Sequence, residues 1–406
     1  MSMNETPSSN RLHIAFFGRR NAGKSSLVNA VTGQNLAIVS DMKGTTTDPV
    51  FKAMELLPLG PVVIIDTPGF DDEGKLGEMR INRTKQVLNK TDAAVLVLDG
   101  ELPPDTALSA VEAELTGLFN EKKIPYLIAL NKCDLCNTDS VSMASESEIL
   151  PVSAKTGFNI NQLKEKIAAM ALDKEPEQRL VADLIKPNDF IILVIPIDKA
   201  APKGRLILPQ QQMIRDILEA GANAISVRET ELRQTLADIG KKPSLVITDS
   251  QAFAQVSAIV PRETPLTSFS ILFARYKGFL KTAVKGAAAL DNLQDGDKVL
   301  ICEGCTHHRQ CDDIGTVKLP RWIKNHSKKE PEFSFCSGGD FPRDLSAYKV
   351  VVHCGACMLN EREMHYRRKH SEGQNIPFTN YGVTIAHMNG ILRRCIEMLN
   401  IKEEGQ

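Results

Sequence analysis

Short apolar runs alternate with amphipathic stretches along most of this chain. Residues 12–18, 62–65 and 190–197 are rich in Val, Ile, Leu and Phe, and runs of this length are typical of strands buried in a sheet. Helical spacing of apolar positions follows several of them, so the pattern predicts an α/β fold with parallel sheets. The runs at 269–274 and 381–390 are also expected to be strands. No apolar run approaches the roughly 20 residues of a membrane helix, and no membrane association is expected.

The length of 406 residues exceeds what one ordinary core holds. A charged, proline-containing stretch near residues 171–189 has the composition of a linker. We expect a P-loop GTPase domain at 1–178, followed by two smaller α/β domains at 183–272 and 273–406. The middle part carries no catalytic constellation, which favours a self-association role and a homodimer.

The charge balance gives no reason to expect nucleic acid as a partner, because Lys+Arg (49) and Asp+Glu (50) are nearly equal. The first ten residues are polar and lack the apolar core of a secretory signal, so a cytoplasmic location is expected. Thiols stay reduced in that compartment. The nine cysteines are therefore predicted to serve metal binding or packing and not disulfides.

The first chemical motif follows the strand at residues 12–18. Gly18, Gly23, Lys24 and Ser25 fill the pattern GxxxxGKS, in which backbone amides and a helix N-terminus hold phosphates. Lysine reaches the β and γ phosphates and serine binds magnesium. The loop residues expected to contact nucleotide are Asn21, Ala22, Gly23, Lys24, Ser25 and Ser26.

Three downstream segments complete a nucleotide site. Asp66 and Gly69 lie in DTPG, where a carboxylate holds magnesium through water and an amide senses the γ phosphate. Asp134 can accept two protons from guanine that adenine does not offer, so the base should be guanine. The predicted base-binding residues are Asn131, Lys132, Asp134, Ser153, Ala154 and Lys155.

Together these motifs resemble the translation-factor-related (TRAFAC-class) small GTPases, in the branch with Era- and MnmE-like GTP-binding domains. Phe70 stands where other GTPases place a water-orienting glutamine. Relatives with a hydrophobic residue there use a potassium ion, held by an asparagine equivalent to Asn21. The resemblance therefore implies GTP, Mg²⁺, potassium-stimulated hydrolysis and Thr46 as a magnesium ligand. The predicted catalytic residues are Lys24, Thr46, Asp66 and Gly69.

Soft metal ligands gather at residues 302–311 (CEGCTHHRQC) and 353–357 (HCGAC). Each group follows an expected strand, and ligand sites of open parallel sheets form at the carboxyl ends of strands. Thiolates suit both zinc and iron–sulfur clusters, so residue type leaves both open. A four-cysteine zinc site would pair Cys302 and Cys305 with Cys354 and Cys357. That alternative would fit a GTPase acting in tRNA modification or ribosome assembly.

The GTPase motifs combined with Cys305-Thr306-His307 and with HCGAC resemble the HydF family, the FeFe-hydrogenase H-cluster maturation GTPases, over the whole chain. The resemblance implies that Cys305, Cys354 and Cys357 bind a 4Fe-4S cluster with one iron left open. His307 and His353 are candidate fourth ligands or hydrogen-bonding neighbours of the ligands. Cys302 departs from the family motif and is expected to be buried as a small hydrophobe.

The same resemblance implies a scaffold and carrier function. A protein of this family would accept the di-iron precursor of the H-cluster, assembled with radical SAM maturation enzymes, and transfer it to apo FeFe-hydrogenase. Three thiolates would keep the cluster in place while an exchangeable position accepts the incoming group.

Overall fold

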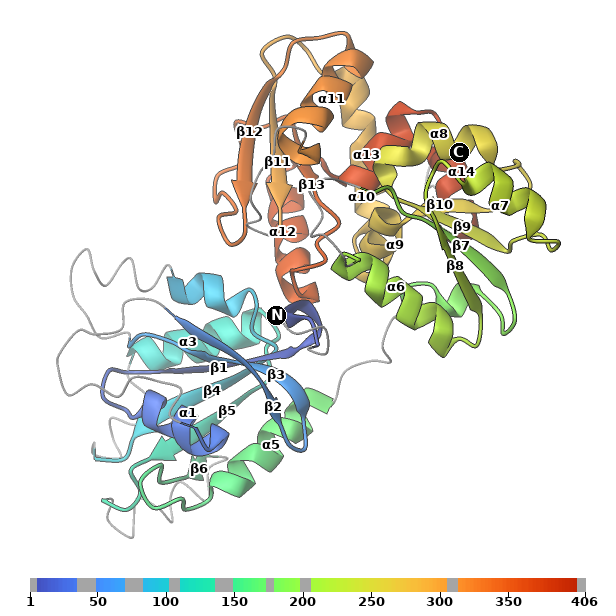
Figure 1. Cartoon of the computed structure of the whole chain (residues 1–406). Coiled ribbons are helices and arrows are strands. Elements are labelled where there is room, and N and C mark those ends of the chain that lie inside the picture. Colours follow the sequence, from blue (N-terminus) through green and yellow to red (C-terminus); the bar gives the residue numbers. More distant parts are fainter. Residues whose placement is uncertain are drawn as a thin grey trace. The chain divides into compact units, whose positions relative to one another are not determined.

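The computed structural model describes residues 6–34, 49–69, 83–101, 110–135, 149–172, 179–197, 206–304 and 313–399. The chain forms two compact units, residues 1–176 and 177–406 (Figure 1). Both are built from sheets flanked by helices, so the predicted α/β class is confirmed.

The first unit contains a six-stranded sheet in the order β2-β3-β1-β4-β5-β6, in which only the β2–β3 pair is antiparallel. Its described strands are β1 (Leu12–Gly18), β2 (Val50–Leu56), β3 (Gly60–Asp66), β4 (Ala93–Asp99), β5 (Tyr126–Asn131) and β6 (Ile149–Pro151). Its helices include α1 (Lys24–Thr32), α3 (Ala110–Glu121) and α5 (Ile160–Leu172), and a 3-10 turn, η1 (Ser8–Asn10), precedes β1.

Strand β1 shows how the apolar pattern builds this unit. Its side chains alternate between the two faces of the sheet, as in any strand. Ile14 and Phe16 pack with residues of α1 and α5, whereas Ala15 and Phe17 pack with residues of α3. The two cores cover both faces, which explains why the strand is apolar throughout.

The second unit contains two four-stranded sheets in which every pair is parallel. The strands of the first are β7 (Phe190–Val194), β8 (Asn223–Val227), β9 (Leu245–Thr248) and β10 (Leu266–Ser268). Those of the second are β11 (Lys298–Glu303), β12 (Glu332–Ser337), β13 (Val350–His353) and β14 (Phe378–Asn380).

The helices of this unit follow the strands in turn. The longer ones are α6 (Leu208–Glu219), α7 (Leu232–Asp238), α8 (Phe253–Ile259), α9 (Phe269–Tyr276), α10 (Leu280–Ala287), α11 (Leu319–Ser327), α12 (Glu361–Gly373), α13 (Tyr381–Met388) and α14 (Leu392–Ile396). Single turns are η3 (Ala182–Leu184), η4 (Ser250–Ala252), η5 (Ala288–Asn292), η6 (Ile314–Lys318) and η7 (Glu397–Leu399).

The two halves of this unit repeat one topology. If the strands of each half are numbered from 1 to 4 along the chain, the order β10-β9-β7-β8 is 4-3-1-2 and the order β12-β11-β13-β14 is 2-1-3-4. The second order read backwards is the first. The sequence repeats as well: PLTSFSILFARYKGFL at 265–280 matches PFTNYGVTIAHMNGIL at 377–392. Helices α6 and α11 both begin with Leu-Pro. The second unit is therefore an internal duplication.

Residues 269–274 and 381–388 are helical, so the expectation of strands there is wrong. In each case a polar residue ends the preceding strand and caps the helix. The Ser268 side chain accepts a hydrogen bond from the Ile271 amide, and Asn380 accepts one from the Val383 amide. Such caps satisfy backbone donors that a first helical turn leaves open.

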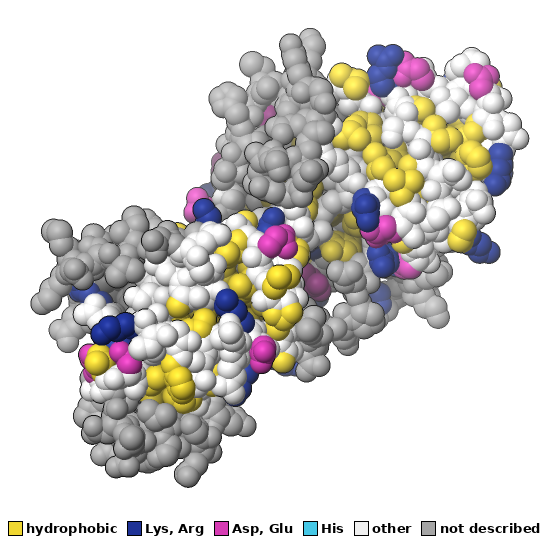
Figure 2. All heavy atoms as spheres, turned by 60° about the horizontal axis from the view of Figure 1, so that its bottom comes forward, with side chains coloured by type: hydrophobic (Ala, Val, Ile, Leu, Met, Phe, Trp, Pro, Cys, Tyr) yellow, Lys and Arg dark blue, Asp and Glu magenta, His cyan; other side chains and the backbone are white. Residues whose placement is uncertain are grey.

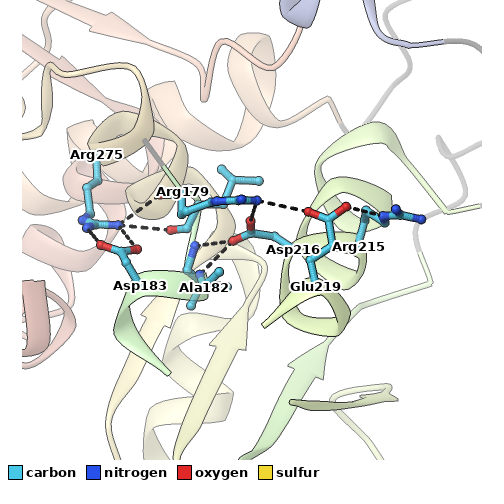
Figure 3. Close-up of polar contacts among 9 residues, drawn as sticks. Arg179, Ala182, Asp183, Arg215, Asp216, Glu219 and Arg275 are labelled. Carbon is cyan, nitrogen blue, oxygen red and sulfur yellow. Dashed lines mark hydrogen bonds and ion pairs between the residues drawn. The ribbon is translucent and has the colours of Figure 1, made fainter. Parts of the chain in front are cut away.

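One continuous apolar core joins both halves, from Leu180 to Leu399. The start of the unit is also tied down by polar contacts (Figure 3). Asp216 on α6 accepts the amides of Val181 and Ala182 at 2.7 and 2.8 Å, and Arg275 on α9 pairs with Asp183. The expected boundary near residue 272 thus falls inside a unit with a shared core.

Among the described residues, no helix has both the length and the apolar composition needed to cross a bilayer. Figure 2 shows the described side chains of one face, where basic and acidic groups lie interspersed with scattered apolar ones. Exposed apolar side chains include Phe51 and Leu57 in the first unit and Ile197 and Leu218 in the second.

Candidate functional site

The phosphate loop connects β1 to α1 and is shaped by backbone conformations that few residues adopt. Asn21 and Gly23 have φ of 61° and 82°, which turn successive amides toward one side. A Cβ at position 23 would lie 2.2 Å from Asn131 Nδ2. Only glycine fits there, because the asparagine amide approaches the loop from the opposite side of the site.

Lys24 and Ser25 lie in the first turn of α1. Lys24 Nζ donates to the carbonyl oxygens of Gly18 and Arg19 at 3.0 and 2.6 Å, which places a positive charge inside the loop. Ser25 Oγ donates to Asp66 Oδ2 at 2.5 Å. The serine and aspartate predicted to bind magnesium are thus in direct contact, at the carboxyl ends of β1 and β3.

Asp66 is a buried carboxylate with spare binding capacity. Burial raises the pKa of Asp66, while the Ser25 hydrogen bond and the positive charge of Lys24 oppose the shift. Its Oδ1 is buried and accepts no hydrogen bond from any described residue. A buried carboxylate oxygen beside a serine hydroxyl fits a hard divalent cation. Nearby, a Cβ on Gly69 would lie 2.6 Å from the Arg20 amide, so this glycine packs directly against the phosphate loop.

The segments predicted to bind the base lie at the carboxyl end of β5 and just after β6. Asn131 joins the loops: its Nδ2 donates to the Ala22 carbonyl at 3.0 Å, and its Oδ1 accepts the Ala154 amide at 3.1 Å. Ser153 Oγ donates to Asp134 Oδ1 at 2.7 Å and so orients the carboxylate expected to read guanine.

Lys132 has a positive φ of 62° and reaches Asp99 and Glu101 at 2.8 and 3.2 Å. Burial lowers the pKa of Lys132, but the hydrogen bonds to the two carboxylates outweigh it and raise the pKa overall. Lys155, which follows Ala154, is exposed.

The thiol-bearing segments meet at the carboxyl ends of β11 and β13, which are adjacent parallel strands with Cys302 opposite His353. Cys354 is the first residue after β13, and its amide donates to the Cys302 carbonyl at 2.8 Å. Two amides approach its sulfur: those of Gly304 at 3.1 Å and Ala356 at 3.4 Å. Cys354 and Cys357 are both partly exposed.

His353 is completely buried and engaged at both ring nitrogens. Nδ1 lies 3.0 Å from the Cys354 carbonyl oxygen and Nε2 lies 3.0 Å from Arg367 Nη1. Burial and the neighbouring guanidinium lower the pKa of His353 to about 3. The imidazole is therefore neutral, donates from Nδ1 and accepts at Nε2. In this arrangement it braces the Cys354 backbone.

Cys302 lies inside β11 with no exposed surface, which agrees with the expectation of a buried small side chain. In the duplicated half the equivalent position is Val194, because each lies opposite the last residue of the neighbouring strand. The sulfur of Cys302 lies 2.8 Å from Cys336 Sγ on β12. Burial and this neighbour raise the pKa of Cys302 well above that of an ordinary thiol.

Several predicted site residues lie outside the described residues: Thr46, Phe70, Cys305 and His307. The structure also reveals neighbours that sequence reasoning missed, namely Arg367, Glu363 and Cys336. Arg367 and Glu363 are separated by one helical turn, a spacing that is also typical of ordinary surface pairs. Their burial depends on where α12 packs, and no local pattern indicates that.

Three family models match the chain. Residues 13–132 match the 50S ribosome-binding GTPase, residues 180–278 the hydrogen maturase F dimerization domain, and residues 281–398 the hydrogen maturase F tetramerization domain. The last two matches coincide with the two halves of the duplicated unit.

Curated relatives resemble mainly the first unit. GTPase Der of Wolinella succinogenes is 34% identical over 176 residues, covering 40% of this chain and 36% of that protein. The tRNA modification GTPase MnmE of Endomicrobium trichonymphae is 32% identical over 191 residues, covering 45% and 40%. The chain thus spans well under half the length of these two relatives.

GTPase Era of Heliobacterium modesticaldum is 28% identical over 226 residues, covering 48% of this chain and 74% of that protein. Among solved structures, Era of Aquifex aeolicus is 20% identical with a TM-score of 0.35, covering 56% of this chain and 98% of that one. A probable GTP-binding protein engB is 26% identical with a TM-score of 0.33, covering 40% and 100%.

The family assignment rests on the order of the three matches. A GTPase domain with an intact phosphate loop precedes both hydrogen maturase F domains, and those two domains alone cover more than half of the 406 residues. The chain belongs to the hydrogen maturase F family.

Proposed function

We propose that this chain is a GTP-hydrolysing scaffold and carrier for the H-cluster of FeFe-hydrogenase. Cys305, Cys354 and Cys357 would hold a 4Fe-4S cluster at the carboxyl ends of β11 and β13. The substrate of the carrier step would be a di-iron precursor, received with the help of radical SAM maturation enzymes and passed to apo-hydrogenase.

The contact that supports this proposal most directly joins the two cysteine segments. The Gly304 amide donates to Cys354 Sγ at 3.1 Å, and Gly304 immediately precedes Cys305 in the chain. Successive Cα atoms are about 3.8 Å apart, so we propose that Cys305, which lies outside the described residues, would supply its thiol to the same cluster as Cys354. The pairing of β11 with β13 therefore brings the two cysteine segments together although they are far apart in the sequence.

The donor set fits an iron–sulfur cluster. Cys354 and Cys357 are partly exposed, which suits a site that exchanges a ligand with another protein. Amide donors stabilise a thiolate and tune the reduction potential of a cluster, and Cys354 has two. When bound, the cluster would supply an iron coordination position open to cargo. His353 would hold the Cys354 backbone, with Arg367 fixing its ring.

On the nucleotide side, Ser25 and Asp66 would hold Mg²⁺, Lys24 the β and γ phosphates, and Asp134 the guanine base. We propose that Asn21 and the loop it shapes hold a potassium ion that substitutes for an arginine finger. Hydrolysis in KCl should then be at least about tenfold faster than in NaCl. Equal rates in the two salts would remove potassium from this account.

We further propose that the chain acts as a homo-oligomer built on a dimer. The names of the two matched domains, dimerization and tetramerization, support this. Exposed apolar side chains on and near α6, including Leu206, Ile207 and Leu218, offer surface for such contact.

Replacing cluster ligands tests the proposal. Anaerobic reconstitution of the unaltered chain should yield about four irons and four sulfides with broad visible absorption. Cys354→Ser and Cys357→Ser should each lose most of both, because two remaining thiolates do not retain the cluster. Cys133→Ser is the matched control, since Cys133 is also partly exposed but lies in the GTPase unit.

Full cluster content in both serine variants would contradict the assignment of ligands. Stoichiometric zinc without iron after anaerobic purification would replace the carrier function with a zinc-containing GTPase. Trp322 lies in α11, so its fluorescence checks that the second unit of the two variants is folded, and their GTP hydrolysis should match that of the unaltered chain.

A further inference from the structure

Three side chains from separate elements converge outside the sites described above. Asp291 lies in η5, His326 in the last turn of α11 and His387 in the last turn of α13. His326 Nε2 lies 2.7 Å from Asp291 Oδ1, and His387 Nε2 lies 3.0 Å from each carboxylate oxygen. We propose that these three residues form a site for a divalent transition-metal ion of the zinc type.

The distances suit one ion. The three candidate ligand atoms all lie within 4.8 Å of one another. Around a tetrahedral zinc ion with bonds of about 2.0–2.2 Å, ligand atoms lie about 3.3 Å apart. Small rotations of exposed side chains reach that geometry, since the two imidazoles are about one quarter exposed and Asp291 about one half. Two histidines and one carboxylate leave a fourth position for water or another ligand.

The local field favours a cation. Helix carboxyl ends carry partial negative charge, and both histidines lie at such ends. Two lysines near His326 pair with carboxylates outside this cluster: Lys324 with Glu330 and Lys329 with Asp295.

In the first half of the second unit, the residues equivalent to Asp291 and His387 form an ion pair. Asp183 precedes β7 by the same interval at which Asp291 precedes β11, and Arg275 occupies in α9 the place of His387 in α13. These two form a direct ion pair, and Arg275 also donates to the Arg179 carbonyl (Figure 3). Arginine stays protonated and has no lone pair for a metal.

At the position of His326, too, the first half carries an arginine. His326 of α11 corresponds to Arg215 of α6, counted from the Leu-Pro start of each helix. Arg215 binds Glu219 on its own helix (Figure 3). The second half thus replaces two arginines with two imidazoles facing one carboxylate. Neutral imidazole is a common metal ligand, and this exchange converts an ion-pair position into a chelating one.

Zinc titration calorimetry of the whole chain tests the site, with Mg²⁺ and GDP in excess to occupy the nucleotide site. His387→Arg restores the pairing seen in the duplicated half, so it should preserve folding while removing a ligand. His326→Gln removes the other imidazole. Each variant should lose one zinc per chain or bind it at least about tenfold more weakly. His365→Gln, on α12, is the matched control and should bind as the unaltered chain does.

Zinc held by cysteines contributes equally to all four proteins, so the comparison does not depend on the cluster assignment. If His387→Arg and His326→Gln bind as many zinc ions with the same affinity as the unaltered chain, no metal site exists here. Binding at this position only above millimolar zinc would overturn the proposal as well.

Discussion

Arg367 is the largest fully buried side chain among the described residues. Its guanidinium donates to Glu363 Oε1 at 2.9 Å, to His353 Nε2 at 3.0 Å and to the Gly338 carbonyl. It therefore ties α12 and the segment after β12 to the end of β13, next to Cys354. A charge buried in this way is tolerable because each of the three guanidinium nitrogens finds an acceptor.

Arg367→Met should destabilise the second unit by about 3–5 kcal/mol, because it leaves the Glu363 carboxylate buried without its partner. Trp322 is the single tryptophan and lies in α11, so its fluorescence during urea unfolding reports on this unit alone. Arg368→Met is the matched control on the same helix. Its pair with Glu372 is partly exposed and should contribute at most about 1 kcal/mol. Equal effects of the two substitutions would contradict this account of Arg367.

Asp134→Asn should weaken GDP binding by about tenfold to a hundredfold, because a charged acceptor of two base protons becomes a neutral amide. Xanthine carries a carbonyl in place of the guanine amine, so the variant should gain affinity for xanthosine diphosphate. Equilibrium titration with fluorescent nucleotides measures both. Unchanged preference for GDP over the xanthosine and adenosine nucleotides would show that Asp134 does not read the base.

The sequence alone predicted much of the nucleotide site. Each of its motifs follows an apolar run and keeps a fixed spacing, and the structure pairs Ser153 with Asp134 and Asn131 with the amide of Ala154. The environment of His353 was beyond reach, because its partner Arg367 comes from a helix whose packing is set by the whole unit.

At the level of elements, Asp216 and Arg275 anchor residues 179–184, and Asp216 binds the backbone of the first turn (Figure 3). Asp216 accepts two backbone amides from a segment with no strand partner of its own. An amide left buried without an acceptor costs about 1–3 kcal/mol, so this side chain determines whether the first turn of the unit stays docked on α6.

Asp216→Ala should lower the free energy of unfolding of the second unit by about 2–4 kcal/mol, since two amides lose their acceptor. Trp322 fluorescence in urea again gives the measurement. Glu219→Ala, one turn further along α6, removes only an exposed carboxylate and should leave the free energy of unfolding almost unchanged, because solvent screens such a pair. A loss no larger for Asp216→Ala than for Glu219→Ala would show that the anchor does not stabilise the unit.

Helices α9 and α13 show why some elements were assigned wrongly. Six of the eight residues of α13 are buried, from Tyr381 to Ala386, so no polar face interrupts the apolar run. Periodicity does not separate a helix buried on all sides from a buried strand. The caps Ser268 and Asn380 were the available signals, and alignment of the two halves would have shown that both segments share one structure.

At the scale of the whole molecule, duplication explains where the iron chemistry would be placed. Both halves of the second unit present strand ends at equivalent positions, but Cys354 stands where the first half has Asp249, after β13 and β9 respectively. The first half thus has the same fold but no cysteine at the position equivalent to Cys354. A family with one GTPase domain and two related α/β domains can separate nucleotide chemistry, subunit contact and metal binding in this way.

The central claim is that three thiolates hold a cluster and leave one iron open to exchange. Electron paramagnetic resonance of the anaerobically reconstituted and reduced chain, recorded with and without imidazole, tests this claim most directly. The account predicts the signal of one reduced 4Fe-4S cluster whose g values shift when imidazole binds. A chain that gives no cluster signal, or a signal that imidazole leaves unchanged, would contradict it.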